Sequence, residues 1–238
     1  MHISNARISS HLTRITKKIN MKNIVLAILT VTSIHVSGQH LIGVKGGVSI
    51  TNISSTEFLD NHESRTGFCG GLSYEYFSKD NHSISVDLVF HQRGFISDVN
   101  FFDDQGNPTG QAAMEFRYDY LSMPIKTGIH VGERLSAFGN LGIVPAILIN
   151  AKTKTPSYVA DGIEYPSETI DVTDVVTKFD FAGLIEIGVN YKTTEKFWLF
   201  SALAYQSSFT TLTNSNYFAD SKIKHNGLTL CLGVKFQH

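Results

Sequence analysis

The sequence has little charge. Of its 238 residues, 17% are Asp, Glu, Lys or Arg, against about 25% in average soluble proteins. The charges nearly cancel, with 20 Lys and Arg against 21 Asp and Glu, so the basic surface of a nucleic-acid-binding protein is missing. Long apolar runs are also missing beyond residue 40, which excludes a polytopic helical membrane protein. An aromatic content of 11% argues against an intrinsically disordered chain.

The first 38 residues carry an export signal. Residues 21–38 combine a basic start at Lys22, an apolar run over 24–36 and small residues before Gln39, which is the pattern of a signal peptide. That run is shorter than the ~20 residues of a membrane anchor, and no cysteine follows it to suggest a lipoprotein. We interpret residues 1–20, basic and without acidic residues, as an upstream extension or a long n-region. A mitochondrial transit peptide is the alternative. Residues 39–238 are then the mature domain.

The mature chain alternates apolar and polar residues with a period of two, which predicts strands with two unlike faces. In residues 228–236, LTLCLGVKF, every second residue is Leu, Val or Phe. The phase of 135–149 and 196–209 stays open because parts of both faces are apolar. Each candidate is close to the ~9–11 residues of a tilted membrane strand. The eight segments are 42–50, 68–76, 84–92, 118–131, 135–149, 179–191, 196–209 and 228–236.

Short and long connections alternate between these segments. Short ones lie at 78–81, 132–134 and 193–196. An exported chain that starts in the periplasm places its odd-numbered connections outside the cell, and these are the long ones. The sequence therefore predicts an all-β fold, an eight-stranded antiparallel up-and-down transmembrane β-barrel with short periplasmic turns and long extracellular loops. The expected long loops are 52–66, 97–117, 150–177 and 210–226.

The polar face of the strands distinguishes a membrane barrel from a soluble, lipocalin-like one. It is rich in Gly, Ser, Ala and Thr, which suit the narrow interior of eight strands, whereas a water-facing surface would favour long polar side chains. Its few charges are balanced, and buried charges must be paired. We therefore expect an internal polar network and no open pore. Its members are Lys45, Glu75, Asp87, His91, Arg93, Lys126, Asp180, Glu186 and Lys235.

Aromatic residues gather near the predicted strand ends. Such rings favour the two membrane interfaces, where they form girdles. We assign to these girdles Tyr74, Tyr76, Phe77, Tyr118, Tyr120, Phe179, Phe181, Tyr191, Phe197, Trp198 and Phe236.

Three segments resemble a known family. They are GVKGGVSITNI at 43–53, YLSMPIK at 120–126 and GVKF at 233–236, and in this order they are similar to the PorT-like outer-membrane β-barrel family of Bacteroidetes. The resemblance implies an eight-stranded barrel in the outer membrane, without catalytic residues. The family's named member is associated with protein secretion. Within this resemblance Pro124 marks a bulge or distortion, because a proline loses a ladder hydrogen bond.

The two cysteines, Cys69 and Cys231, fall on the inward face. Their strands flank the first strand of a closed barrel and are thus two spacings apart, roughly 9–10 Å. A disulfide needs Cα atoms within about 7 Å. We expect two free thiols that face the lumen.

These observations favour a monomeric, non-enzymatic barrel in the outer membrane of a Gram-negative bacterium. Its lipid-embedded part is a scaffold, and the long loops contact protein partners. It is a structural or surface-binding protein, or an accessory to secretion. The alternatives are an outer-membrane lipid-modifying enzyme and a soluble, lipocalin-like ligand-binding barrel. No spacing singles out the Ser–His pair that the enzyme would need. We expect no cofactor and no metal, since acidic loop residues lack the spacing of a calcium site.

Overall fold

The computed structural model describes residues 38–55, 62–78, 81–102, 105–106, 108–160, 163–218 and 221–238. The extension expected over 1–20 lies outside the described residues. So does the expected signal peptide over 21–38, apart from Gly38. Within the described ranges, no helix is long and apolar enough to cross a membrane.

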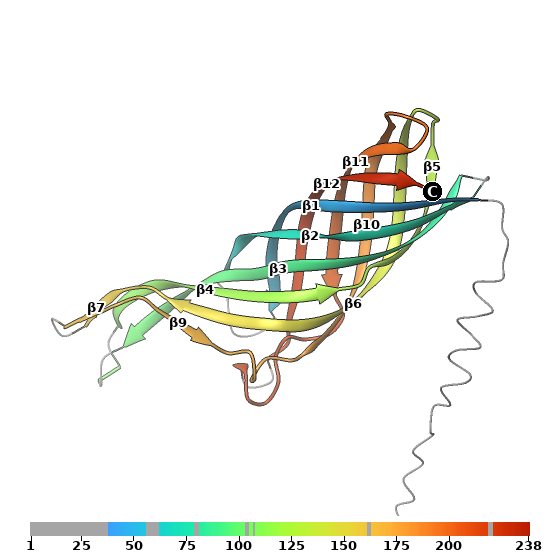
Figure 1. The fold of residues 1–238 in the computed structure, drawn as a ribbon. Helices are drawn as coiled ribbons and strands as arrows, with labels where there is room; N and C mark the ends of the chain where they lie inside the picture. Colours follow the sequence, from blue (N-terminus) through green and yellow to red (C-terminus); the bar gives the residue numbers. More distant parts are fainter. Residues whose placement is uncertain are drawn as a thin grey trace, which may run out of the picture. The chain divides into compact units, whose positions relative to one another are not determined.

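The described residues form a closed antiparallel barrel (Figure 1). β1 pairs with β2 and also with the last strand, and β10 pairs with β6, so the ring is complete. β4 and β5 together take the place of one strand, because β3 pairs first with β5 and then with β4 along its length. The nine named strands therefore make an eight-stranded ring, as the sequence predicts. The ring strands are β1 (Gly38–Ser55), β2 (His62–Ser78), β3 (His82–Phe102), β4 (Pro108–Ser122), β5 (Ile125–Val131), β6 (Leu135–Thr155), β10 (Phe179–Lys192), β11 (Phe197–Ser208) and β12 (Ile223–Gln237).

The break between β4 and β5 lies at Met123 and Pro124. The register against β3 is the same on both sides of the break, since Ser122 pairs with Val89 and Ile125 with Val86. No residue is inserted, so the proline produces a local distortion and not a bulge. Its carbonyl still accepts a hydrogen bond from the Asp87 amide at 2.9 Å.

The outer surface of the barrel is an apolar belt. Leu232 is 63% exposed, while its neighbour Cys231 is buried. On β1 the apolar face runs from Ile42 to Ile50, which at a rise of ~3.3 Å and a tilt of ~35–45° covers roughly 20 Å of bilayer thickness. An apolar surface of this extent is stable in lipid and not in water. Exposed members include Val44, Val48, Leu72, Ile84, Leu88, Ile129, Leu141, Ile143, Ile185, Ile187, Leu199, Leu203, Leu228, Leu230 and Val234.

The structure resolves the phase of the two ambiguous segments. Along most of β6 the odd-numbered residues face outward, as Leu141 does, and the even-numbered ones face inward, as Asn140 does. A register shift against β4 then places both Leu148 and Ala151 inside. On β11 Phe200 faces inward and Leu199 outward.

Four of the expected girdle aromatics face inward instead. Tyr118, Tyr120 and Trp198 are buried inside the barrel, and Phe77 packs edge-on against buried His130 with ring centroids 4.8 Å apart. The pleat of the strand, and not aromatic character, decides which face a residue takes. Other rings do lie on the outer face. Those near the periplasmic ends of the strands are Tyr74, Tyr191, Phe197 and Phe236; those near the opposite ends are Phe68, Phe179, Tyr205 and Phe209.

Much of the expected long loops is sheet. β3 and β6 have 21 residues each, about twice the ~9–11 that a membrane strand needs. Residues 97–117 continue the β3–β4 pair up to Phe102 and Pro108, and β6 continues to pair with β9 (Glu168–Asp171). β7 (Tyr158–Ala160) and β8 (Ile163–Tyr165) make a separate hairpin. We call the extracellular ends of β3, β4 and β6 together with β9 the projecting sheet (Figure 1).

Candidate functional site

The centre of the lumen holds a chain of ion pairs. Asp87 of β3 binds the ammonium groups of Lys45 at 2.5 Å and Lys126 at 3.0 Å. Lys126 also binds Glu186 of β10 at 2.8 Å. All four side chains are at most 8% exposed. Four strands on different sides of the barrel thus meet through their charges.

A second cluster lies towards the periplasmic end. Glu75 of β2 accepts from Lys235 at 2.6 Å and contacts His130 at 3.2 Å. Asn190 accepts a further hydrogen bond from Lys235. His130 and Asn190 are not members of the network that the sequence predicts. Their positions in the alternating strands place both side chains on the inward face. The sequence predicts the network from opposite charges that must be paired, and this criterion does not select neutral side chains.

A third cluster lies towards the extracellular end. Arg93 binds Asp180 at 2.6 Å, and Asp180 also accepts from Ser208 at 2.9 Å. The guanidinium lies over the ring of Tyr120, 4.6 Å from its centroid. His91 lies beside Arg93, whose Nε is 3.4 Å from its Nδ1. The nine residues singled out from the sequence therefore all line the lumen, eight of them in ion pairs and His91 next to one.

An apolar cap closes the extracellular end of the lumen. Tyr118 and Tyr120 pack with residues of the connections, including Val176 and Leu212. Tyr118 and Tyr217 share a hydrogen bond of 2.9 Å between their hydroxyls, and burial raises the pKa of Tyr217. Three voids along the lumen, among and above the ion pairs, measure about 10 to 40 Å³. Each has room for one to about three water molecules, which is far too little for a pore through the described part of the barrel.

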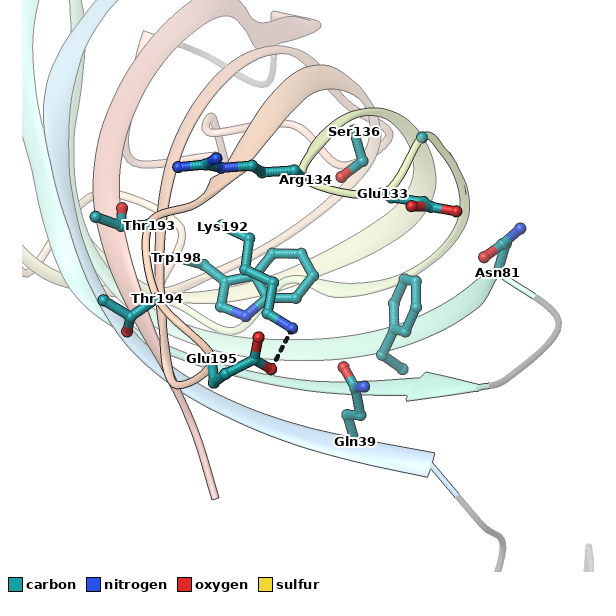
Figure 2. Close-up of a pocket in the computed structure, with 12 residues that line it drawn as sticks. Gln39, Asn81, Glu133, Arg134, Ser136, Lys192, Thr193, Thr194, Glu195 and Trp198 are labelled. Carbon is teal, nitrogen blue, oxygen red and sulfur yellow. Dashed lines mark hydrogen bonds and ion pairs between the residues drawn. The ribbon is translucent and has the colours of Figure 1, made fainter.

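A cavity of about 520 Å³ opens at the periplasmic end (Figure 2). We call it the vestibule. Its walls come from three short turns and the start of β1, and Lys192 and Glu195 form an ion pair of 3.0 Å on its rim. Trp198 and Ser136 line it with buried polar atoms that have no hydrogen-bond partner. The Glu75–Lys235 cluster of the lumen is not part of the vestibule's lining.

The described residues include one Ser–His contact that sequence spacing did not reveal. His130 Nε2 lies 2.9 Å from Ser83 Oγ, and the Glu75 carboxylate contacts the same nitrogen at 3.2 Å. A catalytic Ser–His–acid relay needs the carboxylate on the other ring nitrogen of the histidine. Ser83 and His130 are also at most 3% exposed, so no substrate reaches them. The contact is therefore part of the packing. Within the described ranges, no cluster of three or more His, Cys, Asp or Glu could hold a metal ion.

Cys69 and Cys231 face the lumen, as the sequence predicts, and their sulfur atoms are not bonded to each other in this structure. Their sulfur atoms are nevertheless only 3.3 Å apart. Two strand spacings of a flat sheet, roughly 9–10 Å between Cα atoms, thus do not keep these side chains apart.

Comparison with known families gives the same fold. Residues 37–214 match the model of the family described as outer membrane protein beta-barrel domain. The chain belongs to this family. For this outer-membrane barrel, the apolar belt is the lipid-facing surface, and its location is the outer membrane of a Gram-negative bacterium. No curated protein sequence matches the chain.

Several solved outer-membrane proteins are similar to this barrel. They include OprG of Pseudomonas aeruginosa, with 14% identity and a TM-score of 0.47 over 86% of this chain and 97% of that one. Ail of Yersinia pestis has 14% identity and a TM-score of 0.42, with coverage of 84% and 99%. The protease OmpT of Escherichia coli has 6% identity and a TM-score of 0.39, with coverage of 86% and 98%. Identities this low carry no function from one barrel to another.

Proposed function

We propose that this protein is a closed, non-enzymatic outer-membrane barrel that presents a binding surface for protein partners outside the cell. The observation that supports this proposal most is the combination of a filled lumen with strands that continue far beyond the membrane. A transport protein needs an open path, whereas ion pairs and an apolar cap fill this one. A rigid barrel with extended strands is instead a platform for recognition.

The projecting sheet has features of a recognition surface. β9 pairs with β6 on one side and is exposed along its whole length. Ile170 is an exposed apolar residue on it, and Tyr165 is exposed on the neighbouring hairpin, stacked on Tyr158 with ring centroids 4.8 Å apart. Among the described residues, β9 pairs on one side only. Aromatic and apolar anchors beside such an edge suit a protein partner, which can add a strand and fill side-chain positions. Hydrogen bonds from Thr173 hold the adjoining turn and lower the pKa of Asp171.

Site-specific photo-crosslinking on intact cells tests this proposal. A photoreactive residue at Tyr165 or Ile170 should give protein adducts of defined mass in the native envelope. The same residue at Leu232, on the lipid face, is the matched control and should give lipid adducts. If the projecting positions also give only lipid adducts, or none, the protein does not bind a partner through this sheet.

A second candidate is an accessory role in protein secretion, which the resemblance of 43–53, 120–126 and 233–236 to the PorT-like family of Bacteroidetes supports. The vestibule, with its mixed charges and unpartnered Trp198 and Ser136, would then face the periplasmic machinery. Comparing proteins released by a deletion strain and its parent tests this role. An unchanged set of secreted proteins would contradict it.

A further inference from the structure

The two cysteines of the chain lie on either side of Gly47. This glycine of β1 pairs with Cys69 of β2 and with Cys231 of β12. Both cysteines are inside the barrel and nearly inaccessible, at 3% and 7% exposure. Because Gly47 has no side chain, nothing separates the two sulfur atoms, which are 3.3 Å apart. We propose that Cys69 and Cys231 form a disulfide in the mature protein, a clasp across the seam where β1 and β12 close the barrel.

The local backbone brings the thiols closer than two flat strand spacings would. A Cβ atom placed on Gly47 would lie 2.0 Å from the Leu230 carbonyl oxygen and 2.8 Å from the Cys231 Cα. Cα atoms of β2 and β12 come within 8 Å of each other although β1 lies between the two strands, so the seam is strongly curved, and a side chain at Gly47 would prevent this close packing. The sulfurs must approach by about 1.3 Å more to reach a bond of ~2.05 Å. A void of about 40 Å³ lined by both cysteines leaves room for their side chains to rotate.

The sequence and the location favour the same pairing. The chain has two cysteines, so one intramolecular disulfide is possible. An outer-membrane protein crosses the periplasm, where disulfides form and persist. The oxidant is a disulfide-bearing thiol oxidoreductase or a small-molecule disulfide.

The reaction proceeds by thiol–disulfide exchange. One cysteine thiolate attacks a sulfur of the oxidant's disulfide, which gives a mixed disulfide and releases one oxidant thiolate. The second cysteine thiolate then attacks the mixed disulfide and releases the other oxidant sulfur. The two protons of the cysteine thiols pass to the released thiolates. The oxidant's disulfide is thereby reduced to two thiols as the Cys69–Cys231 bond forms.

The clasp would act on the last step of barrel closure. β1 and β12 are the two ends of the chain's sheet, and their pairing alone closes the ring. A bond from β2 to β12 passes over β1 and holds all three strands together. When the hydrogen bonds between β1 and β12 open briefly, the disulfide would keep the two strands in register.

Mass spectrometry of the protein from its own membranes tests the bond directly. Cells are lysed in denaturant with N-ethylmaleimide, so that buried thiols also react. We expect no adduct before reduction, two adducts after reduction, and an intact mass lower by two hydrogens than that of the reduced protein. Two adducts without reduction, or a disulfide-linked dimer, would overturn the proposal.

A matched variant tests the geometric reason. In the double variant Cys231→Ser, Thr229→Cys the second thiol moves two residues along β12, to the position paired with Ser49, about 6.6 Å away at ~3.3 Å per residue. This variant should take up two adducts without reduction. A cross-link there as efficient as in the wild type would show that the native register is not what selects the pair.

The role as a clasp has its own measurement. On gels that separate folded from unfolded barrels, the wild type should unfold at a lower temperature after reduction. Reduction should leave the Cys69→Ser, Cys231→Ser variant unchanged. A wild-type unfolding temperature that does not respond to reduction would contradict the clasp even if the bond is present.

Discussion

Asp87 is the residue on which the ion pairs of the lumen depend most. It is bound to both Lys45 and Lys126, and its side chain is 1% exposed. The substitution Asp87→Asn keeps the shape and removes the charge. Lys126 keeps Glu186, but among the described residues Lys45 has no other carboxylate in ion-pair contact.

The expected cost follows from leaving a buried cation without its counter-charge. Breaking a buried pair by removing one partner typically costs about 3–5 kcal/mol, so Asp87→Asn should lower the free energy of unfolding by this amount. Glu186→Gln should cost less, since Lys126 keeps Asp87. Asp174→Asn is the matched control, because its pair with Lys178 is solvent-exposed and such pairs contribute little.

Reversible unfolding by urea in lipid vesicles measures these differences. Trp198 is the single tryptophan of the chain and lies buried at the periplasmic end of the lumen, so its fluorescence reports on unfolding. The expected order of destabilisation is Asp87→Asn, then Glu186→Gln, then Asp174→Asn. An Asp87→Asn variant as stable as Asp174→Asn would refute the reasoning.

A second substitution separates lost charge balance from lost shape. Replacing both members of a buried pair by neutral groups is often close to neutral in stability. Adding Lys45→Met to Asp87→Asn should therefore recover more than half of the lost free energy. No recovery would mean that Asp87 acts through packing or through Lys126 alone.

Further predictions concern the belt, the glycines and the cap. Leu232→Arg, at the middle of the lipid face, should cost about 2–4 kcal/mol in the same unfolding assay, whereas Ile42→Arg near the interface should cost at most about 1 kcal/mol. Gly71→Ala should reduce the folded fraction on gels, because its Cβ would meet the Leu88 carbonyl oxygen at 2.0 Å; Gly70→Ala, whose nearest atom is at 3.6 Å, should fold like the wild type. Tyr118→Phe removes the hydrogen bond to Tyr217 and should lower the free energy of unfolding by about 1 kcal/mol in the same unfolding assay. An unchanged free energy of unfolding would contradict a role of this bond in the cap.

The sequence predicts the strands and their facing well because alternation is a local signal. On β3, for example, Ile84, Val86 and Leu88 face out while Ser85 and Asp87 face in, as the period of two requires. It predicts the depth of a residue and the length of a strand less well. The polar extensions of β3 and β6 have loop-like composition but continue the ladder, since pairing with a neighbour and not residue type maintains a strand.

Two other differences have specific causes. A register shift between β4 and β6 changes which residues face inward beyond Leu148, and alternation alone does not reveal where such a shift occurs. The closeness of Cys69 and Cys231 depends on the sharp fold at Gly47. A spacing estimate that assumes a flat sheet omits this curvature.

Ion pairs at its centre and an apolar cap at its extracellular end close the lumen. Conductance of the purified protein in planar lipid bilayers tests this closure most directly. We expect no current steps above those of a protein-free bilayer. Stable steps of uniform size, together with permeation of small sugars into vesicles that contain the protein, would contradict a filled lumen.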